Sequence, residues 1–183
     1  QAFPNPNIYS VGTDERTGFE NCVNLLAERG CQHLVLLLDK GRRSGNIIRS
    51  GFDLGIRSQP GVTGKVYDGL AVTMEAGAEV CKQILQEVPE TDGIIACRAS
   101  IGVGVLYTLQ DLGIKVPEQI ALISEGGNNT CRVCRPAMTN LDTMLTLCAT
   151  LSANTILDVL NGRPVAHSVN LQLELHERAT TNR

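Results

Sequence analysis

The composition of this chain is that of an ordinary globular domain, and it excludes several classes of function. Its 183 residues are 43% hydrophobic and 19% charged, enough for one core or for a core with a small second lobe. No apolar run approaches the ~20 residues that cross a bilayer. The net charge of −3, without a basic block, and an aromatic content of 3% without tryptophan argue against a nucleic-acid surface on this piece.

The first half of the chain alternates helical patterns with short apolar runs. We expect helices at residues 13–29, 46–58 and 73–87, and strands at residues 33–38 and 64–68. Thr13 can cap the first helix, and Gly30 ends it. The run at residues 33–38 is aliphatic without a break, which is typical of a strand buried on both faces. The polar loop at residues 39–45 (DKGRRSG) lies at the tip of that strand.

Residues 93–126 have the pattern of a strand, a helix and a second strand. The apolar run at residues 93–97 leads into a helix with one apolar face, formed by Ile101, Val105, Leu109 and Leu112. Gly113 ends this helix, and a second apolar run at residues 119–124 follows it. Because such units build parallel sheets, we predict an α/β protein with a parallel sheet.

The ends of the chain have weaker patterns. Residues 1–10 are rich in proline and asparagine and resemble a connecting segment. Because Gln1 is not an initiator methionine, we expect a fragment or a processed product. Residues 128–139 are predicted to be irregular, residues 141–160 to form the longest helix, and residues 168–175 to form a strand with one wet face or an edge strand.

Motifs that could carry catalytic, redox or metal chemistry have simpler interpretations. Gly102 and Gly104 lack the third glycine and the strand-tip position of a dinucleotide fingerprint, so we interpret them as sites of close helix packing. Cys131 and Cys134 form a CxxC motif without the partner pair that a zinc site needs, and we expect structural or interface thiols. The seven cysteines are irregularly spaced, which favours buried thiols over a disulfide framework. We expect no enzyme activity, no cofactor and no metal.

The most specific segment is residues 102–124, GVGVLYTLQDLGIKVPEQIALIS, in which VPE precedes an apolar strand. Weaker marks are Val11-Gly12-Thr13-Asp14 with Gly18, LLAERGCQHLVLLL at residues 25–38, Ser50-Gly51-Phe52, RPAMTNL at residues 135–141, and Leu175, Arg178, Thr180 and Thr181. Together these segments resemble the ligand-binding core of the lactose-repressor/galactose-repressor family of bacterial transcription regulators. The match covers nearly the whole chain from about residue 10.

The resemblance implies two Rossmann-like lobes joined by three crossovers, each lobe a parallel-sheet Rossmann-like sandwich of the periplasmic-binding-protein type I. Residues 10–137 and 168–183 would form the carboxyl-terminal subdomain, and residues 138–167 a crossover and a helix of the amino-terminal subdomain. Residues 1–9 would be a linker or a remnant of that subdomain. Most of the amino-terminal subdomain and the DNA-binding headpiece would be missing, so the chain would carry half of an effector site. The apolar face of the helix at residues 141–162 would then lack its sheet.

The sequence departs from the sugar-binding pattern of this family at the strand tips. Ile48 stands where an arginine is usual, Arg98-Ala99 replaces Asn-Asp, and Gly126 replaces an aspartate. We expect a cationic pocket for an acidic or phosphorylated effector, because arginine forks bind carboxylate and phosphate in two-point contacts. The candidate ligand-binding residues are Lys40, Arg42, Arg43, Ser44, Arg49, Arg98, Ser100, Glu125 and Gly126. Alternatively, Arg98 is a solvated or interface arginine and the pocket is unused.

The resemblance also places a homodimer interface on the helix after Arg98 and on the CxxC segment. The candidate interface residues are Leu106, Leu109, Gln110, Cys131 and Val133. Alternatively, the leucines belong to the core, since a helix has one core face.

The predicted function is that of a cytoplasmic regulator's sensing core, which binds a small-molecule effector and touches DNA only through a headpiece outside this chain. A periplasmic sugar-binding protein of a transporter has the same architecture and is the alternative, although seven cysteines and the VPE segment count against it. A remnant that only dimerises is a third possibility. We expect no membrane contact.

Overall fold

The computed structural model describes residues 8–183, so most of the predicted linker at residues 1–9 lies outside the described residues. The strands are β1 (Ser10–Asp14), β2 (His33–Asp39), β3 (Thr63–Leu70), β4 (Gly93–Ala96), β5 (Ala121–Glu125), β6 (Thr139–Asp142), β7 (Ser168–Gln172) and β8 (Glu174–His176). The helices are α1 (Glu15–Glu28), α2 (Gly45–Ser58), α3 (Met74–Glu87), α4 (Ala99–Asp111), α5 (Asn128–Val133) and α6 (Leu145–Leu160), with a 3-10 turn at Ala179–Thr181.

The body of the molecule is a six-stranded sheet in the order β3-β2-β4-β5-β6-β8. All neighbours are parallel except β6 and β8, which run antiparallel. Leu34 pairs with Gly93, and Gly93 pairs with Ala121, so the three central strands start in register. This arrangement confirms the predicted parallel α/β fold.

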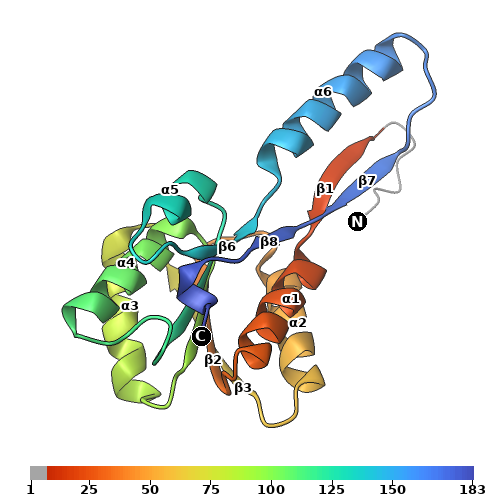
Figure 1. The fold of residues 1–183 in the computed structure, drawn as a ribbon. Coiled ribbons are helices and arrows are strands. Elements are labelled where there is room, and N and C mark those ends of the chain that lie inside the picture. Colours follow the sequence, from red (N-terminus) through yellow and green to blue (C-terminus); the bar gives the residue numbers. More distant parts are fainter. Residues whose placement is uncertain (1–7) are drawn as a thin grey trace.

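The sheet is covered by helices on both faces, and β2 shows how the sequence specifies this. Val35 and Leu37 belong to one core cluster, with side chains of α3 and α4. Leu34, Leu36 and Leu38 belong to the other cluster, with side chains of α1 and α2. Because successive side chains of a strand point to opposite faces, the unbroken aliphatic run supplies both cores. Figure 1 shows the two helix pairs on either side of the sheet.

Helices α3 and α4 approach each other closely at two glycines. A Cβ atom on Gly104 would lie 2.0 Å from the backbone oxygen of Met74, and one on Gly77 would lie 2.2 Å from the backbone oxygen of Ile101. Both contacts are with backbone atoms, which cannot rotate away. The prediction that Gly104 permits close packing is confirmed.

The carboxyl-terminal third differs from the sequence-based prediction. Residues 139–142 form β6 instead of the start of the long helix, because this segment pairs with β5 and β8. Helix α6 begins only at Leu145, after Met144 adopts a left-handed conformation with φ 53°. Residues 128–133, predicted to be irregular, form α5. The single strand predicted at residues 168–175 is two strands that belong to different sheets.

The start of the described chain also differs. Residues 10–14 form β1, and the side chain of Asp14, not of Thr13, caps α1 by accepting a hydrogen bond from the backbone N–H of Thr17 at 3.1 Å. β1 pairs only with β7, in parallel, so these two strands form a separate sheet. The carboxyl-terminal subdomain predicted from the sequence included both strands, yet neither belongs to the six-stranded sheet.

Helix α6 extends away from the body together with β1 and β7 (Figure 1). None of its residues is buried. Its large exposed apolar side chains are Leu145, Leu147, Ile156, Leu157, Val159 and Leu160. In residues 8–183 no helix combines the length and the hydropathy needed to cross a membrane.

We predict that Gly104→Ala destabilises the protein by about 1–3 kcal/mol, because the added methyl group forces α3 and α4 apart. Denaturant unfolding of the full-length protein measures the effect. Gly45→Ala at the start of α2 is the matched control, since a Cβ atom there meets no heavy atom within 4 Å, and it should change stability by less than about 1 kcal/mol. Equal losses for both variants would contradict the packing argument.

Candidate functional site

An open cavity of about 620 Å³ lies at the carboxyl edge of the six-stranded sheet. It is lined by Thr13, Glu15, Asp39, Lys40, Gly41, Arg42, Arg43, Ser44, Arg98, Glu125, Thr143, Leu145 and Leu173. The tips of β2, β4 and β5 and the loop after β2 supply its charged side chains except Glu15, which begins α1. They lie together because the carboxyl ends of parallel strands meet at one edge. Residues in or next to β1, α6 and β7 also line the cavity, namely Thr13, Thr143 with Leu145, and Leu173.

Six of the nine predicted ligand-binding residues line this cavity, namely Lys40, Arg42, Arg43, Ser44, Arg98 and Glu125. Arg49 instead forms an ion pair with Asp68, with an N–O distance of 2.6 Å, beside a smaller cavity of about 160 Å³. Ser100 and Gly126 are not among the residues that line the larger cavity.

Sequence reasoning missed Glu15 and Asp39 as site residues. Asp39 is the last residue of β2, and a carboxylate at a strand tip was an available signal. Glu15 is the first residue of α1, where an acidic side chain is also explained by the helix dipole. No sequence pattern indicates that it faces the loop at residues 40–44.

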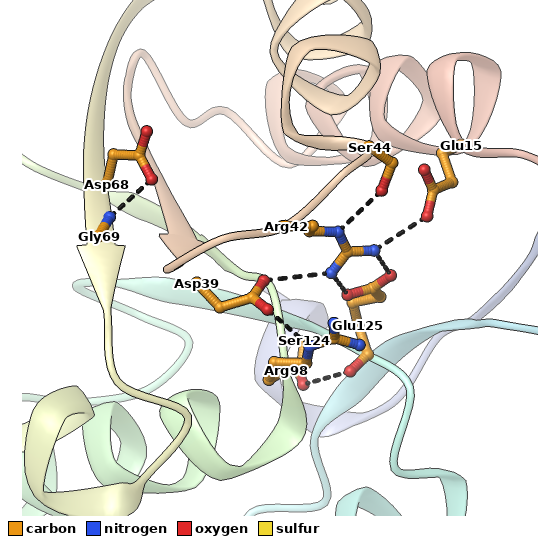
Figure 2. A network of polar contacts seen from close by, with 9 residues as sticks. All are labelled: Glu15, Asp39, Arg42, Ser44, Asp68, Gly69, Arg98, Ser124 and Glu125. Atoms are coloured by element: carbon orange, nitrogen blue, oxygen red, sulfur yellow. Dashed lines mark hydrogen bonds and ion pairs between the residues drawn. The ribbon is translucent and has the colours of Figure 1, made fainter.

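The centre of the site is the guanidinium group of Arg42, whose side chain is only 6% exposed. Its Nη1 donates to Glu125 Oε2 at 2.5 Å and to Asp39 Oδ1 at 3.4 Å. Its Nη2 donates to Glu15 Oε1 at 2.9 Å and to the other oxygen of Glu125. Its Nε donates to Ser44 Oγ at 3.0 Å. Figure 2 shows this network, which joins α1, the tips of β2 and β5, and the loop before α2.

Arg42 therefore has no donor left for a ligand. A guanidinium group has five N–H donors, and all five of Arg42 have acceptors within the protein. Burial disfavours its charged form, but the hydrogen bonds and the charge of Glu125 outweigh burial and raise the pKa of Arg42. Arg42 and Glu125, two of the candidate ligand-binding residues, therefore line the cavity as an internal ion pair in which each neutralises the other.

Arg98, like the exposed Arg43, keeps its terminal nitrogens open toward the cavity. Its Nε donates to Asp39 Oδ2 at 3.1 Å, and within residues 8–183 its Nη1 and Nη2 atoms make no hydrogen bond. Its side chain is 43% exposed. Its backbone has φ 106° and ψ 129°, a region that side-chain-bearing residues rarely adopt. Lys40 and Arg43, also on the cavity wall, are exposed.

The candidate dimer residues divide into buried and exposed ones. Leu106, Leu109 and Cys131 are fully buried in the core, so the alternative that the leucines are core residues is correct. Gln110 is exposed and donates to the backbone oxygen of Arg135. Val133 is 65% exposed.

The CxxC motif lies in and after α5, with both thiols free. Cys131 is fully buried and Cys134 nearly so. Burial raises the pKa of both thiols, which keeps them in the unreactive thiol form. In the described part of the chain no group of three or more histidine, cysteine or acidic side chains could hold a metal ion.

The comparisons with known proteins identify the family. Residues 23–181 match the model of the periplasmic binding protein-like domain. The chain belongs to this family. Among its relatives are an HTH-type transcriptional regulator of Lachnoclostridium phytofermentans, 23% identical over 97% of the chain and 54% of the relative, and the regulator GntR of Escherichia coli K12, 22% identical over 85% and 47%.

Solved structures of regulators share the same fold. GntR of Chromobacterium violaceum matches all of the chain and 68% of its own length, with a TM-score of 0.91 and 20% identity. A complex of the regulator CelR with cellobiose covers 97% of the chain and 55% of its own length, with a TM-score of 0.84 and 20% identity. A sugar-binding LacI-family regulator of Escherichia coli in complex with phosphate covers 93% and 62%, with a TM-score of 0.84 and 19% identity.

These matches confirm the resemblance to the lactose-repressor/galactose-repressor family that the VPE segment indicates. The chain spans about half the length of the curated relatives it matches. In these relatives the matched region is one part of a longer regulator.

We predict that Arg42→Met destabilises the protein by about 3–5 kcal/mol, because Glu125 would remain buried without its counter-charge and Asp39 would keep only Arg98. Urea unfolding of the full-length protein measures the loss. Arg49→Met is the matched control. It removes an arginine from the exposed pair with Asp68 and should cost less than about 1 kcal/mol. A loss for Arg42→Met no larger than the control's would show that the network is not needed for stability.

Proposed function

We propose that this chain is the greater part of the effector-sensing core of a cytoplasmic LacI-type transcription regulator. The observation that carries the proposal is the cavity at the carboxyl edge of the sheet, which is lined in part by residues in or next to β1, β7 and α6. A small molecule in this cavity touches the segments through which a second subdomain would be joined. Ligand binding then favours one geometry of these connections over another, which is a population shift.

The exposed apolar side chains of α6 support a second subdomain. Six large apolar residues on one helix without a buried position form a surface that soluble monomers rarely leave uncovered. We assign α6, with the β1–β7 pair, to the amino-terminal subdomain, and residues 15–142 with 174–183 to the carboxyl-terminal one. The rest of the amino-terminal subdomain and a DNA-binding headpiece would lie elsewhere in the full-length protein.

The effector in this proposal is a sugar derivative that carries an acidic group. The three carboxylates of the site are engaged by Arg42 and Arg98, whereas Lys40, Arg43 and the terminal nitrogens of Arg98 remain open to the cavity. Exposed guanidinium and ammonium groups favour carboxylate or phosphate. Among related structures, one regulator is bound to phosphate and another to cellobiose.

We predict that the full-length regulator binds glucuronate or glucose 6-phosphate more tightly than glucose. The three sugars share a ring and differ in the charge at one carbon. Isothermal titration and the shift in melting temperature measure binding of each sugar. A DNA-binding assay then measures whether the bound sugar releases the regulator from DNA or keeps it there. Binding of glucose alone would contradict the acidic class while leaving the sensing role. A protein that binds neither DNA nor any sugar would contradict the proposed function.

We also propose a homodimer that uses the outer side of α4 and α5. Its support is a set of exposed apolar side chains on or next to these helices: Tyr107, Leu112 and Val133. Exposed apolar groups beside polar ones are typical of the contact surfaces of subunits.

The dimer proposal predicts that Tyr107→Glu combined with Val133→Glu converts the full-length protein to a monomer in sedimentation velocity, since it would bury uncompensated charges in the contact. Leu54→Glu on α2 is the matched control, because Leu54 is exposed to a similar degree as Tyr107 and lies on the other face of the sheet. A dimer that survives the double substitution would place the interface elsewhere.

A further inference from the structure

The strained backbone of Arg98 points to a role beyond packing. Arg98 lies between β4 and α4, with φ 106° and ψ 129°. A glycine would adopt this conformation freely, whereas any other residue is strained in it. Such strain persists where the surroundings fix the residue, and it is concentrated at functional sites. Here the fixing partner is Asp39, which is 5% exposed and accepts from Arg98 Nε at 3.1 Å.

The contact with Asp39 uses one side of the guanidinium group and leaves the other side open. Nε is engaged, while the four N–H groups of Nη1 and Nη2 have no acceptor within residues 8–183. Arg98 belongs to the cavity wall. Both oxygens of Asp39 are already engaged, since Oδ1 accepts from Arg42 and Oδ2 from Arg98. The two arginines that contact Asp39 thus differ. Arg42 is buried and every N–H of its guanidinium group has an acceptor, whereas Arg98 is half-exposed and its terminal N–H groups are available to a ligand.

The geometry points to a division of labour in which Arg98 alone makes the two-point contact with the effector's carboxylate or phosphate. Asp39 is a positioning residue that holds Arg98 in its strained conformation, and Arg42 is a positioning residue that holds Asp39 and does not touch the effector. This inference rests on the proposed function and names the residue that decides between acidic and neutral effectors. Planar guanidinium groups are suited to such bidentate contacts.

The test compares variants of the full-length regulator by calorimetric titration with glucuronate, glucose 6-phosphate, inorganic phosphate and glucose. Arg98→Gln should weaken binding of the acidic ligands about 10- to 100-fold and change glucose binding less than about threefold. Arg57→Gln removes an exposed arginine of α2 that does not line the cavity and is the matched control, with an expected change below about threefold for every ligand. Arg43→Gln tests the other open arginine of the wall and should weaken the acidic ligands less than Arg98→Gln does.

The Arg98→Gly variant distinguishes a loss of ligand binding from a loss of stability. Glycine relieves the backbone strain, so this variant should melt at or above the temperature of the wild-type protein while losing the acidic ligands as Arg98→Gln does. Asp39→Asn should reduce the preference for acidic over neutral ligands, because it removes the charge that orients Arg98, and this ratio would not change if Asp39 were only structural.

The possible outcomes show whether the role of Arg98 or the proposed effector class is wrong. If the wild-type protein binds an acidic ligand and Arg98→Gln and Arg98→Gly bind it equally well, the inference is wrong and the sensing role stands. If Arg43→Gln causes the larger loss, the contact belongs to Arg43. If the wild-type protein binds none of the acidic ligands, both the inference and the acidic effector class are overturned.

Discussion

The buried guanidinium of Arg42 is the interaction on which the carboxyl edge of this protein depends. It gathers carboxylates from α1, from the tip of β2 and from the tip of β5, three segments that share no local sequence. Removing charges from water is unfavourable, and a buried ion pair is stable only when every donor and acceptor is satisfied. Here each N–H of Arg42 has an acceptor, so the network fixes the strand tips and at the same time engages Arg42 and its three carboxylate partners within the protein.

The sheet and its helices were predictable because their signals are local. The aliphatic run of β2, the pattern in α4 and the VPE segment before β5 each indicate their element without reference to the rest of the chain. β6 was missed because Thr139 and Asn140 are polar, and their burial is explained only by partners distant in sequence. The hydroxyl of Thr139 pairs with that of Thr181 at 2.8 Å, and the side chain of Asn140 with that of Asn128.

The location of the candidate site was predictable from the sequence, but the role of each residue in it was not. Strand tips converge at one edge of a parallel sheet, which is why six of the nine candidates line one cavity. The sequence presents Arg42, Arg43 and Arg98 as equivalent cations. Only the structure separates a saturated arginine from an open one, because hydrogen-bond partners such as Glu15 and Glu125 lie 27 and 83 positions away from Arg42. Leu106 and Leu109 were ambiguous for a similar reason, since most sides of α4 are buried.

The glycine contacts between α3 and α4 have a consequence for how motion can pass through the molecule. At Gly77 and Gly104 the two helices meet backbone against backbone, and such a joint has no rotamers to rearrange. We therefore expect the six-stranded body to move as a rigid unit. A displacement at its carboxyl edge would be concentrated in the short connections beside Thr143 and Leu173 and would change the orientation of β1, β7 and α6, which extend away from the body (Figure 1).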